Sequence, residues 1–216
     1  MKAGQCAESP TALMVLLCLL AMVVPAAKAQ VQRDDFDVSD GKIERSTDGH
    51  LMVLTKEMRA TLKFLTPQSV NLKFTYLGPT SDVSRLGNGE VRSQFGIKLR
   101  AQDTCNVVYV MWHFAPDQKI AVSVKRNPGK RTHEECLDNG YINGLKPLVL
   151  ALPKNIRPSD QSHSFTASMN GSDLTVTADG IVVWKGDLGR VALEFNGPVG
   201  LRSDNADLVF EFWASR

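Results

Sequence analysis

Apolar and polar residues alternate with a period of two along most of the chain. Turn-forming residues interrupt the alternation about every eight to twelve positions, a spacing typical of an all-β sandwich. Asn170-Gly171 and Asp179-Gly180 are the residue pairs that type I′ hairpin turns require. Residues 34–49 are polar and acidic, and we expect an irregular lead-in there. We therefore predict a two-sheet antiparallel β-sandwich with little helix, with strands at 51–54, 59–65, 70–77, 94–101, 104–114, 119–126, 148–152, 163–169, 173–178, 181–185, 199–202 and 208–213.

The first 29 of the 216 residues have the pattern of an export signal. Lys2 precedes an apolar run at 13–24, and Ala27-Lys28-Ala29 fits the small-x-small pattern of a cleavage site. The alternative is an uncleaved membrane anchor, but the run is shorter than the ~20 residues that span a bilayer. We expect residues 1–29 to be removed and residues 30–216 to form one secreted or periplasmic domain.

The overall charge argues against two classes of partner. The chain has 43% hydrophobic and 22% charged residues, as globular proteins do, and a formal net charge of +2. A balance so close to zero gives no electrostatic reason to expect nucleic acid or a bilayer surface as the main partner. We therefore expect neither nucleic-acid binding nor membrane insertion of the mature chain.

Cys105 and Cys136 are the two cysteines outside the export signal. In an oxidising compartment two cysteines most simply form a disulfide, which here would close a loop of roughly thirty residues, worth ~3 kcal/mol in the chain-entropy model. The alternative is a zinc site that adds His133 and His113 to the cysteines. The tight paired spacings of zinc sites are absent, so we predict the disulfide and no metal.

The C-terminal part of the chain resembles a known superfamily. The segment HSFTASMNGSDLTVTADGIVVWKGDL and the later GPVGLRSDNADLVFEFWAS are similar to the C-terminal half of concanavalin A-like jelly rolls of the laminin-G or lectin/glucanase type. The likeness is also close to the 3-keto-disaccharide hydrolase-like domain, and covers roughly the last fifty residues well. It implies a jelly-roll fold, while the insertion that carries Cys136 has no counterpart in the common pattern.

Three consecutive strands predict one polar face. Alternation assigns Phe95, Val110 and Val122, with their neighbours two positions away, to the buried side. The other face then carries an aromatic ring among hydrogen-bond donors, with no acid from these strands, a mixture suited to sugars or acidic glycans. The alternative is an ordinary solvated sheet face. The candidate ligand-binding residues are Lys98, Arg100, Tyr109, His113 and Lys125, with Ser123 beside them.

Several loop residues have competing interpretations. Asp103 and Asn106 flank a turn that a site could use, but we expect them to set the turn. Tyr141 could line the site or pack its own loop. The run 202–205 with Asp207 is oxygen-rich like a calcium loop, but lacks the spacing of an EF-hand, so we expect no cofactor there. Asn170 begins a formal glycosylation sequon that coincides with a hairpin turn.

A non-catalytic glycan-binding module is the function that these features favour. No strand carries the carboxylate pair that a glycosidase of this fold needs. One alternative is a polysaccharide lyase using Tyr109, His113, Arg100 and Gln94; another is a hydrolase acting through Glu134 or Glu135. A structural or protein-interaction domain is the remaining alternative, because a fold does not decide chemistry.

Overall fold

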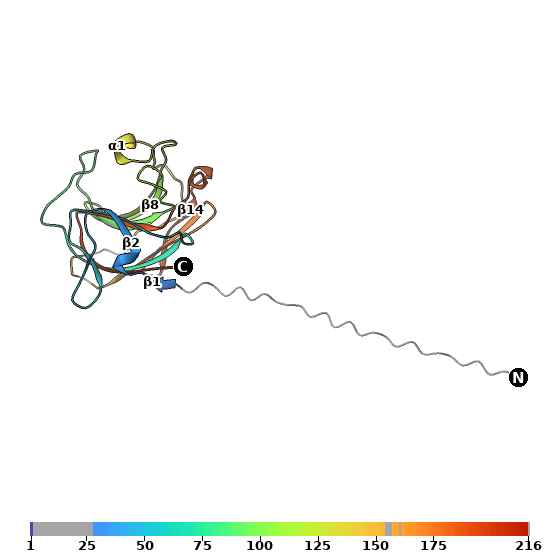
Figure 1. Cartoon of the computed structure of the whole chain (residues 1–216), viewed down its shortest axis with the longest axis horizontal. Coiled ribbons are helices and arrows are strands. Elements are labelled where there is room, and N and C mark those ends of the chain that lie inside the picture. Colours follow the sequence, from blue (N-terminus) through green and yellow to red (C-terminus); the bar gives the residue numbers. More distant parts are fainter. Residues whose placement is uncertain (2–27, 154–156, 160, 216) are drawn as a thin grey trace.

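The computed structural model describes residues 1, 28–153, 157–159 and 161–215 and forms a sandwich of two antiparallel sheets (Figure 1). The first sheet contains nine strands, in the order β11 (Val149–Leu150), β14 (Ile181–Asp187), β13 (Asp173–Ala178), β12 (His163–Asn170), β6 (Ser69–Gly78), β16 (Asp207–Ser215), β4 (Leu51–Val53) and β3 (Glu44–Arg45), with β1 (Lys28–Gln30) also paired to β16. The second contains seven, in the order β10 (Tyr141–Ile142), β9 (Lys119–Lys125), β8 (Val107–Ala115), β7 (Ser93–Leu99), β15 (Gly200–Asp204), β5 (Glu57–Leu62) and β2 (Phe36–Asp40). The predicted jelly-roll sandwich is confirmed.

The core lies between the two sheets and is rich in aromatic rings. Phe74 of β6 packs edge-on against Phe95 of β7 and Trp112 of β8, with ring centres 5.6 Å apart in both pairs. The apolar residues that alternation assigned to the buried side of β7, β8 and β9 all belong to this core. The opposite residues of these strands, including Tyr109 and Met111, form a small separate cluster on the outer face of the seven-stranded sheet.

The prediction of an irregular segment at 34–49 is wrong. Residues 33–35 form a short 3-10 helix, β2 pairs with β5, and β3 pairs with β4. Phe36 is buried in the core and Val38 packs against it, while Asp37 and Ser39 point away. β2 is an edge strand with one face exposed to solvent. Its solvent-facing polar residues made the short alternation of Phe36 and Val38, which the core requires, difficult to recognise in the sequence.

The two predicted hairpin turns differ in type. In the β13–β14 turn both loop residues, Asp179 and Gly180, have positive φ angles (48° and 81°), as type I′ requires. In the β12–β13 turn Asn170 pairs with Asp173, so Gly171 and Ser172 form the loop and only Gly171 has a positive φ. The type I′ assignment is therefore wrong for this turn, which has the pattern of type II′.

The predicted export signal lies mostly outside the described residues. Lys28 and Ala29 pair with Ser215 and Ala214 in the β1–β16 ladder. Cleavage after Ala29 would remove these two pairs and leave Gln30 opposite Trp213. No helix among the described residues is long and apolar enough to cross a bilayer.

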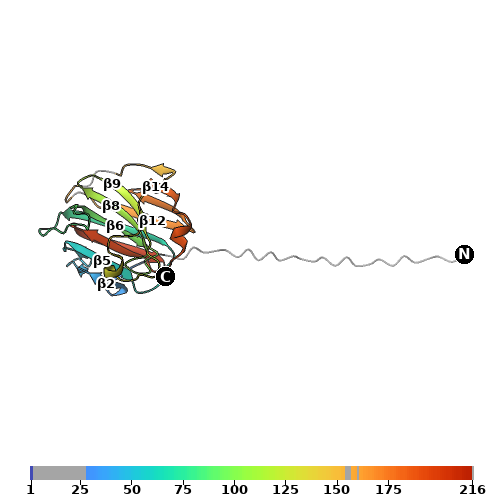
Figure 2. The same ribbon diagram turned by 90° about the horizontal axis from the view of Figure 1, so that it is seen from above.

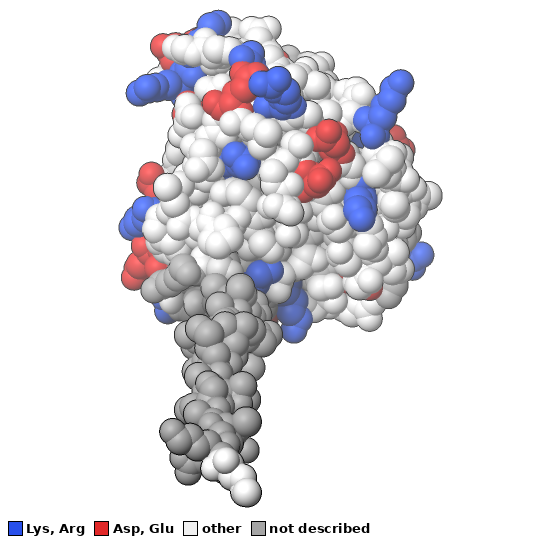
Figure 3. Space-filling model, turned by 90° about the vertical axis from the view of Figure 1, so that its right-hand side faces the viewer, with Lys and Arg blue, Asp and Glu red and all other residues white. Residues whose placement is uncertain are grey.

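Figure 2 looks onto the sheets, so that β6 and β12 of the nine-stranded sheet overlap in this view with β8 and β9 of the seven-stranded one. Basic and acidic side chains are interspersed on the face shown in Figure 3, in keeping with a formal net charge of +2. That face presents no single-sign field, so a charged site has to come from local clustering. The short helix α1 (His133–Cys136) stands above β8 in Figure 1, within the long connection between β9 and β11.

Candidate functional site

Two adjoining cavities lie on the outer face of the seven-stranded sheet. The first, here the cationic cavity, has a volume of 690 Å³ and is lined by Ser39, Asp40, Glu57, Arg59, Arg85, Leu86, Gly87, Lys98, Thr104, Tyr109, Lys125, Arg131, Thr132, His133, Glu134, Asp138, Tyr141 and Arg202. The second, here the edge cavity, has a volume of 520 Å³ and is lined by Leu86, Gly87, Asn88, Arg92, Gln94, Tyr109, Met111, His113, Ile120, Ala121, Val122, Ser123, Asp138, Tyr141, Asn143, Leu145, Pro147, Leu150, Trp184 and Arg202.

Strand register brings the polar residues of the floor together. Lys98 of β7 is opposite Tyr109 of β8, and Gln94 is opposite His113. On its other side β7 pairs with β15, where Gln94 is opposite Asp204. Residues two or four positions apart on one strand lie on the same face of the sheet, and so do residues opposite each other on neighbouring strands. These side chains therefore project toward the cavities rather than into the core.

Asp204 anchors the floor through three side chains. Its carboxylate accepts hydrogen bonds from Arg202 Nε (2.8 Å), Arg59 (2.5 Å) and Gln94 Nε2 (2.5 Å). Burial by itself would raise the pKa of this carboxyl, but the two guanidinium groups hold it at about 2. Asp204 is therefore ionised at neutral pH, and its role is to fix the directions of Arg202 and Arg59.

Arg202 extends from β15 across β7 to β8. Its guanidinium carbon lies 5.1 Å from the centre of the Tyr109 ring, a cation–π distance. Gly96 is the residue of β7 opposite both Arg202 and Met111, and a Cβ on it would lie 2.8 Å from Met111 Sδ. A side chain at this position would therefore disturb the packing of the floor.

Lys98 is the cation of the floor without a partner among the described residues. It is only 5% exposed, and neither a hydrogen bond nor an ion pair within the described ranges reaches its ammonium group. Burial, followed by repulsion from Arg59 and Arg202, lowers the pKa of Lys98 to about 8. The charge of Asp37 acts in the opposite direction but forms no ion pair with Lys98, so an anion in the cationic cavity would supply the direct partner that this lysine lacks.

His113 faces the edge cavity as a neutral ring. Burial first, and the charges of Arg92 and Lys119 next, lower the pKa of His113 to about 4. Gln94 beside it donates to Asp204, while its carbonyl oxygen is buried without a hydrogen-bond partner among the described residues. A neutral imidazole and a free amide oxygen can both bind the hydroxyl groups of a ligand.

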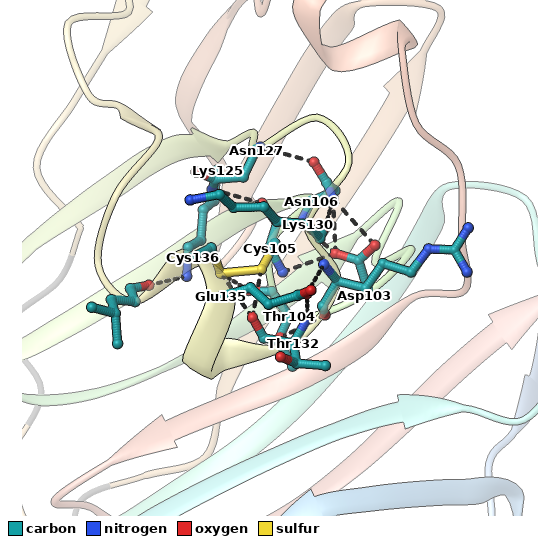
Figure 4. The surroundings of a disulfide bond; sticks show 12 residues. Asp103, Thr104, Cys105, Asn106, Lys125, Asn127, Lys130, Thr132, Glu135 and Cys136 are labelled. Carbon is teal, nitrogen blue, oxygen red and sulfur yellow. Dashed lines mark hydrogen bonds between the residues drawn. A yellow bond between two sulfur atoms is a disulfide. The ribbon is translucent and has the colours of Figure 1, made fainter.

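The wall above the floor is tied down by the predicted disulfide. Cys105 and Cys136 are bonded, with their Cα atoms 5.8 Å apart (Figure 4). Around the disulfide, Asn106 Oδ1 accepts from the Asn127 amide (2.9 Å), and Asn106 Nδ2 donates to Lys130 O (2.9 Å). The connection that carries α1 is therefore attached to the β7–β8 turn by a covalent bond and by several hydrogen bonds.

Lys125 and Tyr141 join this wall to the sheet. Lys125 Nζ donates to the carbonyl of Leu137 (2.6 Å), and lies 5.3 Å from the centre of the Tyr141 ring. The Tyr141 ring is stacked near Tyr109, with centres 6.1 Å apart. Burial, followed by the electrostatic effect of neighbouring Tyr109, raises the pKa of Tyr141 to about 12, so its hydroxyl stays protonated and can donate.

A second loop reaches the wall from the opposite side. Gly87, in the connection between β6 and β7, is so close to Asp138 that a Cβ on it would overlap the Asp138 carboxylate. Leu86, Gly87 and Asp138 line both cavities. This contact therefore lies where the two cavities join.

Four of the five predicted ligand-binding residues line the cavities, and Arg100 does not. Lys98, Tyr109 and Lys125 line the cationic cavity, and Tyr109 and His113 line the edge cavity. β7 ends at Leu99, and Arg100 has a φ of 47°, so the alternation that assigned it to this face stops before it. Its guanidinium donates instead to the carbonyl of Phe195. Tyr109 itself is only 6% exposed, which leaves little free ring surface for stacking.

Sequence reasoning missed Arg59 and Arg202 and left Tyr141 undecided. The acidic side chains of the cationic cavity also come from outside the three strands: Glu57 and Asp40 from β5 and β2, and Glu134 and Asp138 from the wall. The alternation of apolar and polar residues in β15 and β5 can be recognised in the sequence. No local sequence pattern, however, indicates that these strands extend the polar face formed by β7, β8 and β9. That information lies in the strand order.

Hydrogen bonds show the structural roles of two of the loop residues with competing interpretations. Asp103 Oδ1 accepts from the amides of Cys105 and Asn106 (both 2.8 Å), so Asp103 sets the turn as expected. Asn205 has a φ of 51° and bonds the backbone of Ser84 and Arg92, so this residue of the oxygen-rich run forms the turn between β15 and β16. Within residues 28–153, 157–159 and 161–215, no three His, Cys, Asp or Glu side chains are grouped as a metal site would require.

Comparisons with known proteins give structural matches alone. No protein-family model and no curated protein matches the chain. The carbohydrate-binding module CBM66 from Bacillus subtilis matches with a TM-score of 0.54 and 13% identity, over 82% of this chain and 91% of that chain. The fold is that of lectin and carbohydrate-binding-module jelly rolls.

Two further structures support the same architecture. The metal-free carbohydrate recognition domain of Emp46p has a TM-score of 0.52 and 10% identity, over 84% of this chain and 88% of that one. A protein described as a putative glycosyl hydrolase from Parabacteroides distasonis has a TM-score of 0.51 and 9% identity, over 86% and 90%. At such identities the likeness concerns the fold alone, which is consistent with the concanavalin A-like resemblance of the sequence.

Proposed function

We propose that this protein binds a saccharide in the cationic cavity, preferentially an acidic one, without cleaving it. The observation that carries the proposal is Lys98, a lysine only 5% exposed whose ammonium group has no hydrogen bond or ion pair among the described residues, in a cavity that the partly exposed ring of Tyr141 also lines. A volume of 690 Å³ is within the range of small-ligand sites. Rings and well-placed hydrogen-bond donors are what the recognition of sugars requires.

The structural neighbours support carbohydrate as the class of ligand. One is named a carbohydrate-binding module and another a carbohydrate recognition domain. A shared fold does not by itself assign a function. The proposal therefore depends on the side chains of the cavity, and the neighbours add that this architecture is used for carbohydrate recognition.

The charges of the cationic cavity favour an anionic ligand. Its lining includes six Lys and Arg side chains and four acidic ones, namely Arg59, Arg85, Lys98, Lys125, Arg131 and Arg202 against Asp40, Glu57, Glu134 and Asp138. Asp204, paired with Arg59 and Arg202 in the floor, adds a fifth acid, and the positive charge that is still in excess in this partly closed cavity attracts anions even though the whole chain is nearly neutral. Uronate or sulfate groups on a glycan would provide such anions.

Binding without cleavage is supported by the state of the candidate acids and bases. Asp204 is held ionised by Arg202 and Arg59, and the raised pKa of Tyr141 makes its hydroxyl a poor base. In the lyase interpretation Tyr109 and His113 would work as a pair, one of them removing a proton beside a uronate. Their backbone positions are four residues apart on β8, roughly 13 Å at ~3.3 Å per residue, which does not favour a pair at one sugar unit.

We also propose that the mature protein is secreted or periplasmic. The export-signal pattern of residues 1–29 motivates this location, and the Cys105–Cys136 disulfide is compatible with an oxidising compartment. A glycan outside the cytoplasm would then be the natural partner.

The test is retention on immobilised polysaccharides, with pectate as the acidic probe and dextran as the neutral one, followed by analysis of the products. The variants are Lys98→Met in the cationic cavity and Arg100→Met as the control. The control removes a cation from the end of the same strand, at a residue that lines neither cavity. We expect retention on pectate that weakens with salt and with Lys98→Met, and no loss with Arg100→Met.

Equal losses in the two variants would contradict the placement of the site. Unsaturated uronate products would instead support a lyase. New reducing ends would support the alternative of a hydrolase acting through Glu134 or Glu135.

A further inference from the structure

The edge cavity passes around the free edge of β9. Its lining includes Ala121 and Ser123, which point to the outer face of the sheet, and Ile120 and Val122, which belong to the core side. β10 pairs only with Val124 and Lys125 of β9. Within the described part of the chain, residues 119–123 of β9 therefore form an open sheet edge that no further strand covers. The cavity therefore continues from the polar floor toward the interior of the sandwich.

The chemical character of the lining changes along this path. Beside the cationic cavity the edge cavity is polar, with Gln94, His113 and Arg202. Beyond the edge of β9 it is lined by Leu145 and Pro147 of the connecting segment and by Leu150 and Trp184, which are paired across β11 and β14. Figure 2 shows β9 and β14 at the same end of the sandwich.

The apolar end of the edge cavity opens beside an uncharged surface segment. Residues 147–153 carry no charged side chain. Leu148, Leu150 and Leu152 are 85%, 67% and 82% exposed. Contiguous exposed leucines are unusual on a soluble protein and mark a surface that contacts something apolar.

From this continuity we infer that the saccharide ligand carries an apolar substituent, and that the edge cavity binds it. The inference rests on the proposed function, because the sugar would occupy the cationic cavity. Tyr109, Tyr141 and Arg202 line both cavities, so one ligand can reach from Lys98 to Trp184 without leaving the lined space. The ligand class is an acidic glycoside with an alkyl, acyl or aryl group, as in a glycolipid.

Methyl and hexyl glucuronide are the probes, titrated calorimetrically below the concentration at which the hexyl compound forms micelles. Complete burial of an alkyl chain should raise affinity about fourfold per methylene. Leu150→Ser removes an apolar lining residue that is mostly exposed, so its loss does not threaten folding. Ala121→Phe fills the cavity from β9, and Leu65→Ser, at a leucine of matched exposure (66%) that lines neither cavity, is the control.

We expect the hexyl compound to bind at least tenfold more tightly than the methyl compound, and this advantage to disappear in Leu150→Ser and Ala121→Phe but not in Leu65→Ser. Equal affinity of the two glucuronides would overturn the inference while leaving the saccharide site intact. An advantage that persists in both cavity variants would overturn it as well. If neither glucuronide binds, the saccharide site and the inference both fail.

Discussion

The guanidinium of Arg202 lies over the ring of Tyr109, with 5.1 Å between its central carbon and the ring centre. The two residues are on strands that are not neighbours, because β7 separates β15 from β8. The contact therefore depends on which side chain β7 carries between them. The residue of β7 opposite Arg202 is Gly96, which has no side chain.

Replacing Gly96 should disturb this packing. A Cβ at Gly96 would overlap the backbone carbonyl oxygen of Val110 and lie 2.8 Å from both the Cα and the Sδ of Met111, and overpacking of this kind costs about 1–3 kcal/mol. We expect Gly96→Ala to lower the free energy of unfolding in urea by that amount. Gly144→Ala is the control, because a Cβ there meets no atom within 4 Å. Equal stability of the two variants would show that the floor is not tightly packed.

Removing the charge of Asp204 should be among the costliest changes in the domain. Asp204→Asn would leave the buried Arg202 without its ion-pair partner and Arg59 with only the longer, 3.7 Å pair to Glu57, a loss of about 3–5 kcal/mol. Urea unfolding measures it. Asp82→Asn is the matched control, since the Asp82–Lys56 pair is exposed and should contribute little. If the two substitutions had similar effects, the Asp204 network would not hold the floor together.

His113 should make the domain sensitive to mild acid. Its pKa is about 4 in the folded protein and 6.5 as the ordinary value, so between these pH values the unfolded chain binds more protons. The stability that the neutral ring provides is therefore complete above pH 6.5 and falls as the pH is lowered toward 4. His113→Gln should flatten this part of the pH–stability profile. His133→Gln, at an exposed residue, should not.

Lys98 should make binding of an acidic saccharide depend on pH. With a pKa of about 8 the ammonium group is charged below that pH and neutral above it. Affinity for methyl glucuronide should thus be high below pH 8 and fall as the pH rises, with a midpoint that the bound anion shifts upward. Calorimetry from pH 6.5 to 9.5 tests this, and Lys98→Met should bind weakly with no such fall. A flat profile in the native protein would contradict a role for Lys98.

Opening the disulfide should loosen the wall of the site. The bond separates residues 31 positions apart, for which the chain-entropy model gives about 3–4 kcal/mol. The double variant Cys105→Ala/Cys136→Ala should lose this stability and also affinity for pectate, because Lys125 and Tyr141 contact the wall. Loss of stability with unchanged affinity would mean that the hydrogen bonds of Asn106 and Asn127 hold the wall by themselves.

Sequence periodicity predicted the sandwich because the core requires a strict alternation of inward and outward residues. It placed Lys98, Tyr109 and Lys125 correctly on one cavity-lining face for the same reason. It failed for Arg100, where the strand ends one residue earlier and φ becomes positive. Alternation describes a residue only while the strand continues.

The contributions of Arg59 and Arg202 could not be read from the sequence. They depend on β15 being inserted between β7 and β5, a long-range pairing that no local pattern encodes. The run 202–205 resembled an oxygen-rich loop, although Arg202 and Asp204 are strand residues whose side chains bond each other across the floor. The edge cavity is also a long-range feature, since it exists only because β10 is too short to cover β9.

The most direct test of the saccharide site is the change in amide chemical shifts when pectate oligosaccharides are added to isotope-labelled protein. The account predicts changes concentrated at Gly96, Lys98, Tyr109, Tyr141 and Arg202, on the outer face of the seven-stranded sheet. The opposite sheet offers an internal comparison, a depression of 350 Å³ lined by His50, Lys73 and Glu211. Changes confined to that depression, or no changes at saturating ligand, would contradict the proposal that the cationic cavity binds saccharide.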